Sequence, residues 1–103
     1  MKNYVYIFHI AAPMTPSEGA MAAWGKWFET LGAAVVDGGN PFNMEKDMQA
    51  QVKDGKVTMD WKTACGYCIV KAEDLKAAVT MAMGCPVATG DDSWVEVYET
   101  MPM

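Results

Sequence analysis

The chain contains no arginine, only one histidine, and no apolar run near the ~20 residues of a membrane-spanning helix. Arginine supplies the bidentate grip on phosphate and guanine. An acidic chain without it, with a net charge of −5, is poorly suited to binding nucleic acid. The first residues are too short and too aromatic for a signal peptide. We therefore expect neither a nucleic-acid partner nor a membrane partner.

Cysteine is also scarce, and the three thiols are Cys65, Cys68 and Cys85. An odd number of cysteines without a secretion signal indicates reduced thiols and a cytoplasmic location. Cys65 and Cys68 have CxxC spacing, but strand residues three apart point to opposite faces with Cα atoms ~10 Å apart, beyond disulfide reach. Zinc binding would need a second pair. We expect packed thiols, no metal and no cofactor.

The residues that are present indicate a single domain over residues 1–103. The hydrophobic fraction is 51%, which favours burial of some apolar surface against a partner subunit. Residues 43–56 are polar and charged, and we expect either an irregular excursion or a strand on each side of Asp54-Gly55, which is a hairpin signal. Periodicity and turn residues predict strands over 3–11, 33–37, 57–60, 65–71 and 94–99, a first helix that ends at Leu31 before Gly32, and a second helix over 73–83.

The order β-α-β-β(-β)-α-β is the split βαβ pattern of the ferredoxin-like arrangement. It predicts an α+β fold with one antiparallel sheet and two helices on one face. The first strand is apolar on both sides, with Tyr4 and Tyr6 on one side and Val5 and Ile7 on the other. The two helices would cover one side of the sheet and a second copy that packs sheet to sheet would cover the other, so we expect a homodimer.

The chain also resembles the YCII-related family of dimeric α+β barrel proteins. The resemblance rests on Tyr4-Val5-Tyr6-Ile7, on residues 23–32 running into Val35-Val36-Asp37-Gly38-Gly39-Asn40-Pro41-Phe42, on residues 65–72 with Gly84-Cys85-Pro86, and on residues 95–99. It implies a ferredoxin-like protomer, a barrel-forming dimer and a small-molecule site near the helix–sheet cleft. Members of the family are suspected of using a histidine near the start of the first helix, together with an aspartate. Met21 stands at that histidine's place in this chain.

His9 and Asp37 are the candidate catalytic residues. His9 is the only imidazole available for acid–base chemistry. If it shares the helix side of the sheet with Val95 and Val97, it lies under the first helix as a pocket acid or base. The alternative is a structural histidine with hydrogen-bonded partners. Asp37 either orients His9 at a pocket mouth or braces the turn that follows it.

Five residues are candidates for ligand contact: Trp24, Trp27, Gly38, Gly39 and Tyr98. The two tryptophans either stack on a flat ligand or pack in the core or dimer interface. The two glycines allow backbone to approach a ligand closely. With the valines against the helices, Tyr98 and Glu96 point into the dimer barrel beside Tyr4 and Tyr6, as a dimer contact or a proton-handling site.

The function we expect is that of a small-molecule-binding cytoplasmic homodimer. As an enzyme, it would perform cofactor-free acid–base chemistry of the isomerase, lyase or monooxygenase kind on a small cyclic or aromatic compound. The alternative is a non-catalytic module that binds a metabolite or a protein. Fold alone does not separate these functions.

Overall fold

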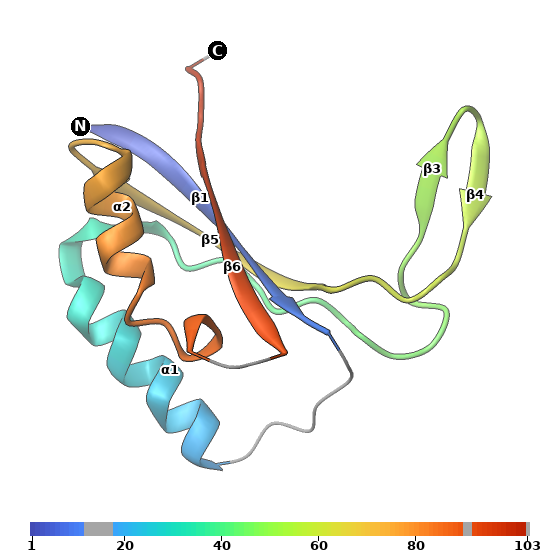
Figure 1. Cartoon of the computed structure of the whole chain (residues 1–103), viewed down its shortest axis with the longest axis horizontal. Coiled ribbons are helices and arrows are strands. Elements are labelled where there is room, and N and C mark those ends of the chain that lie inside the picture. The colour runs from blue at the N-terminus through green and yellow to red at the C-terminus, as the bar shows by residue number, and fades with distance from the viewer. Residues whose placement is uncertain (12–17, 90–91, 103) are drawn as a thin grey trace.

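Four strands form one antiparallel sheet in the computed structural model, which describes residues 1–11, 18–89 and 92–102 (Figure 1). The order across the sheet is β2 (Val35–Asp37), β5 (Ala64–Ala72), β1 (Lys2–Ile10) and β6 (Ser93–Glu99). Two α-helices, α1 (Glu18–Leu31) and α2 (Leu75–Ala82), lie on one face of it (Figure 1). The predicted α+β architecture is confirmed, with β1 and β5 at the centre.

The ends of the helices follow local sequence signals. Gly32 has a φ of +52°, the left-handed conformation that commonly ends a helix, and a short 3-10 turn η1 (Gly32–Ala34) follows α1. The carboxylate of Asp74 accepts a hydrogen bond from the Ala77 N–H at 2.8 Å and caps α2. A second 3-10 turn, η2 (Pro86–Ala88), follows α2. No helix in the described ranges is long and apolar enough to cross a membrane.

Of the two conformations expected around Asp54-Gly55, the structure has the hairpin, a separate two-stranded sheet of β3 (Gln51–Lys53) and β4 (Lys56–Thr58). Asp54 and Gly55 have φ angles of 53° and 74°, as a type I′ turn requires. The hairpin projects from the body of the domain, on the side of the main sheet away from both helices (Figure 1). We call residues 51–58 the arm.

The core lies between the helices and the sheet. Its members are Tyr4, Tyr6, Phe8, Trp27, Leu31, Cys68, Val70, Ala72, Ala78, Ala82 and Cys85. The Tyr6 hydroxyl donates a hydrogen bond to the Ala78 carbonyl at 2.6 Å, which ties β1 to α2. Burial raises the pKa of Tyr6 to about 12. The phenol is therefore a neutral donor in the core.

The opposite face of the sheet is not covered by either helix, and we call it the open face. It carries Val5, Ile7 and His9 from β1, Tyr67 and Ile69 from β5, and Trp94, Glu96 and Tyr98 from β6. The prediction that His9 lies under α1 is wrong. Phe8 pairs with Val95, whereas His9 pairs with Trp94 on the other side. Burying the aromatic side of β1 removes more apolar area from water, so that side turns to the helices.

The predicted grouping of Glu96 and Tyr98 with Tyr4 and Tyr6 is wrong for the same reason. Tyr4 and Tyr6 are fully buried on the helix side, whereas Tyr98 is 50% exposed on the open face. Alternation along a strand sets which residues share a side, but not which side meets the helices.

Candidate functional site

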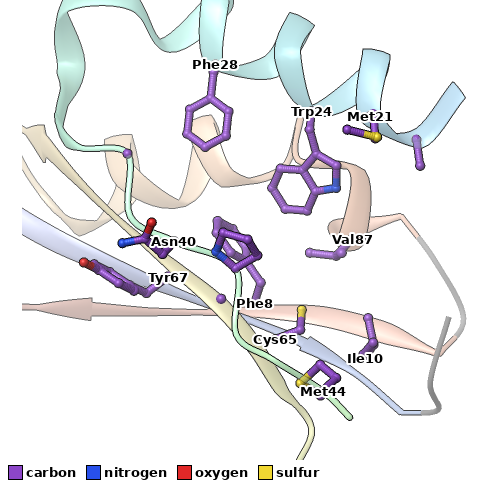
Figure 2. A pocket seen from close by; sticks show the side chains of 14 residues that line it. Phe8, Ile10, Met21, Trp24, Phe28, Asn40, Met44, Cys65, Tyr67 and Val87 are labelled. Atoms are coloured by element: carbon purple, nitrogen blue, oxygen red, sulfur yellow. The ribbon is translucent and has the colours of Figure 1, made fainter. Parts of the chain in front are cut away.

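A cavity of about 540 Å³ lies between α1 and the sheet, and we call it the helix-side cavity. Figure 2 shows its walls converging from three directions. The labelled side chains are Met21, Trp24 and Phe28 from α1, Phe8, Ile10, Cys65 and Tyr67 from β1 and β5, and Asn40, Met44 and Val87 from the connecting segments. A cavity of this size suits a small organic molecule.

Aromatic packing positions the α1 wall. Trp24 meets Phe8 edge to face, with ring centroids 4.9 Å apart at 77°, and lies 6.3 Å from Phe28. Trp27 lies behind Trp24 in the core, where its indole N–H donates to the Met81 carbonyl at 3.0 Å. The tryptophans therefore divide the two predicted roles: Trp24 lines the cavity, and Trp27 holds α1 against α2.

An irregularity in the sheet brings Cys65 into the cavity wall. Phe8 pairs with Gly66 but His9 pairs with Ala64, so Cys65 is an extra residue in β5. Such a bulge turns a side chain away from its alternating position. Cys65 points towards the cavity in Figure 2. Burial raises the pKa of its thiol, which keeps the group protonated at neutral pH.

The two glycines after β2 have different surroundings. Gly38 lines the cavity, and a Cβ added there would meet nothing within 4 Å. Gly39 has a φ of +70°, and a Cβ there would lie 1.8 Å from the Tyr67 carbonyl oxygen. Gly39 therefore allows the segment after β2 to lie directly against β5, whereas only Gly38 faces the cavity.

Asp37 braces this same turn. Its Oδ1 accepts a hydrogen bond from the Gly39 N–H at 2.8 Å, and its Oδ2 accepts one from the Tyr67 hydroxyl at 3.3 Å. The negative charge of Asp37, followed by burial, raises the pKa of Tyr67. The structure thus gives Asp37 the turn-bracing contacts that were one of its two expected roles.

His9 and Asp37 are not brought together. Asp37 pairs with Ile69, Ile69 pairs with Val5, and His9 lies further along the strand from Val5. Two strand spacings and the rise of four residues along β1 put the Cα atoms of His9 and Asp37 roughly 16 Å apart. That distance excludes a direct hydrogen bond between them.

His9 instead contacts Glu96 and Thr63 on the open face. Its Nε2 lies 2.5 Å from Glu96 Oε1, and its Nδ1 lies 2.8 Å from Thr63 Oγ1. The imidazole stacks on Trp94, with the ring planes 4° from parallel and the ring centroids 5.1 Å apart. A hydrogen bond to Glu96 raises the pKa of Tyr98. Sequence reasoning missed the His9–Glu96 pair because only the register of β1 against β6 brings the two residues together.

The candidate residues therefore fall on opposite sides of one sheet. The helix-side cavity contains Trp24 and Gly38, and none of its lining residues carries a charge. The open face contains His9 and Tyr98.

Within the described parts of the chain, no group of three or more His, Cys, Asp or Glu residues is placed to hold a metal ion. No protein-family model matches this chain, and no curated protein matches it either.

Proposed function

We propose that this chain binds a small, uncharged organic molecule with a flat or cyclic frame in the helix-side cavity. The observation that carries the proposal is the cavity itself, about 540 Å³ in volume and lined by aromatic and sulfur-containing side chains without a charged residue. Ligand pockets of ~300–1,000 Å³ are typically apolar with a few polar groups that set orientation.

The lining residues indicate the chemistry of the ligand. Trp24 and Phe8 offer ring faces and edges, and Met21 and Met44 are adaptable apolar contacts. The Asn40 amide can both donate and accept hydrogen bonds. A charged ligand would lose its hydration in this cavity without gaining an opposite charge. A neutral compound with one polar substituent fits best.

These surroundings favour binding over acid–base catalysis. Cys65 and Tyr67 line the cavity, but the Tyr67 hydroxyl donates its hydrogen bond to Asp37 on the open face, so the ionisable group in the cavity wall is the Cys65 thiol. Burial raises the pKa of this thiol, which therefore keeps its proton at neutral pH and is not a base there. His9 and Asp37 lie on the open face rather than in this cavity.

Calorimetric titration with 2-acetylnaphthalene and 2-naphthoate tests the proposal, because the two probes share a ring system but differ in charge. We expect the neutral ketone to bind and the anion to bind at least about tenfold more weakly. Trp24→Ala should abolish binding of the ketone, whereas Trp94→Ala on the open face should leave it unchanged. Equal binding of the two probes, or equal loss in the two variants, contradicts this assignment.

The same proposal includes a homodimer formed through the open face of a ferredoxin-like protomer, as in dimeric α+β barrels. The strand order β2-β5-β1-β6 supports that topology. The partly exposed Val5, Ile7 and Ile69 at the centre of the open face support a sheet-to-sheet contact. Sedimentation velocity at micromolar concentration should give twice the chain mass, and Ile7→Lys should give a monomer. A wild-type monomer contradicts the dimer.

The free thiols of Cys65, Cys68 and Cys85 support a reducing, cytoplasmic location within this proposal.

Proton transfer at the open face is a second candidate function. It is favoured by the hydrogen-bonded series of Thr63, His9 and Glu96, in which a carboxylate and a hydroxyl occupy both imidazole nitrogens. Exchange of the α-protons of cyclohexanone with deuterated water, followed by NMR, measures such an activity. Loss of catalysed exchange in both His9→Ala and Glu96→Gln supports this function. A wild-type rate equal to that of buffer alone excludes it for this probe.

A further inference from the structure

The arm exposes apolar residues that no other described part of the chain covers. Every residue from 51 to 60 is exposed, and β3 and β4 pair only with each other in the described chain. Val52 and Val57 stand opposite each other across the hairpin, with 71% and 60% of their surface exposed. The arm therefore presents a cross-strand apolar pair to its surroundings.

A free arm of this size is a weak structure. Each of its strands has three residues, and an isolated two-stranded hairpin is only marginally stable in water. The Asp54-Gly55 turn favours the hairpin locally, but the turn does not bury the valines. A partner that covers Val52 and Val57 would stabilise the observed conformation.

The position of the arm indicates what that partner is. The arm projects on the side of the sheet that faces away from the helices, which is also the side of the open face (Figure 1). A molecule seated on the open face therefore lies next to the arm. In the proposed dimer, that molecule is a second copy of this chain.

The area of the open face supports the same occupant. Four strands at their usual spacing, over a length of about six residues, give a face of roughly 400 Å². A stable interface buries about 800 Å² on each partner. The open face alone supplies about half of this area. An arm that also contacts the partner brings the interface closer to the area that a stable dimer needs.

Charge is also complementary between the arm and a second copy. The arm carries Lys53 and Lys56 against a single Asp54, whereas the whole chain has a net charge of −5. The rest of the molecule is therefore acidic, and its open face carries the carboxylates of Glu96 and Asp37 against the single lysine Lys71. A weakly basic arm is attracted to an acidic copy of the same chain.

We infer that the arm of each protomer packs its Val52–Val57 face against the other protomer in the dimer. The inference rests on the proposed homodimer. In a two-fold symmetric dimer the contact occurs twice, so each copy both gives an arm and receives one. The arm is then part of the interface and not an independent appendage.

Dilution sedimentation of the full chain tests the inference with the double variant Val52→Ser/Val57→Ser. Because both side chains are exposed in the protomer, the variant should keep the wild-type fold, as near-ultraviolet circular dichroism can verify. Two valines in each arm lose their burial, so the dimer dissociation constant should rise at least about tenfold. Leu75→Ser/Val79→Ser is the matched control, since both residues are exposed on α2 on the helix side. It should keep the wild-type constant.

Amide hydrogen exchange gives a second measurement on the unmodified chain. The amides of residues 51–58 should be protected at concentrations where the dimer forms and should lose protection on dilution. A wild-type dimer whose dissociation constant is unchanged by the arm variant overturns the inference and leaves the dimer intact. Equal weakening by the arm variant and the α2 control also overturns it. A wild-type monomer at every concentration overturns both the inference and the dimer.

Discussion

Gly39→Ala should both destabilise the protein and damage the wall of the helix-side cavity. Gly39 has a φ of +70°, and its added Cβ would lie 1.8 Å from the Tyr67 carbonyl oxygen. The clash is with backbone, so no side-chain rotation relieves it. The segment that carries Asn40 and Pro41 along the cavity must therefore withdraw from β5.

Two contributions set the expected magnitude. An alanine in the left-handed region costs about 1–2 kcal/mol relative to glycine. Withdrawal from β5 also weakens the Phe42 N–H to Cys65 carbonyl hydrogen bond, which measures 2.8 Å. Losing such a bond costs about 1 kcal/mol. The free energy of unfolding should fall by about 2–3 kcal/mol, a large share of the 5–15 kcal/mol typical of a small domain.

Urea unfolding followed by tryptophan fluorescence measures this change, and Gly38→Ala provides the neighbouring control. Gly38 has no atom within 4 Å of an added Cβ and lacks a positive φ, so its replacement should change stability by less than about 1 kcal/mol. Binding of 2-acetylnaphthalene should weaken in Gly39→Ala because the Asn40 segment moves. Equal stability of the two variants would refute the packing role assigned to Gly39.

Three further predictions concern buried hydroxyl and thiol groups. Tyr6→Phe should lower the free energy of unfolding by about 1 kcal/mol, since it removes the buried hydrogen bond to the Ala78 carbonyl, and an unchanged urea midpoint would contradict that contact. Burial raises the pKa of Cys68 to about 11 and that of Cys85 to about 12, both above the 9.0 of a free thiol. The folded state therefore holds protons that the unfolded chain releases above pH 9. The free energy of unfolding is unchanged below pH 9 and falls as the pH rises towards 12, by up to about 1.4 kcal/mol per thiol and pH unit. Urea midpoints that stay constant from pH 9 to 11 would exclude this. A thiol reagent at pH 8 should modify the half-buried Cys65 before the buried Cys68, as mass spectrometry can show. Bound 2-acetylnaphthalene should slow the modification of Cys65. Equal labelling of Cys68 in the native protein would count against the described core.

Local signals in the sequence were sufficient for most of the elements. Gly32 ended the first helix because glycine adopts a positive φ without a steric penalty. Asp54-Gly55 gave the hairpin because both residues tolerate the type I′ turn. The second helix begins at Leu75 and not at the predicted residue 73, because Asp74 acts as its cap.

The candidate site was harder to predict, because it depends on long-range register. The Phe8/His9 irregularity moves Cys65 into the cavity wall, and no local pattern marks that bulge. The contact between His9 and Glu96 joins residues at opposite ends of the chain. The sidedness of β1 depends on which of two apolar faces buries more area, and both faces satisfy the alternation rule equally well.

The central strand β1 is a wall shared by the helix-side cavity and the open face. Phe8 contacts the cavity, whereas Ile7, the residue before it, faces the other side. A ligand that displaces Phe8 also moves the backbone that carries Ile7 towards the proposed partner. Ligand binding and self-association are then thermodynamically linked. If a ligand tightens the dimer by some factor, the dimer must bind that ligand more tightly by the same factor.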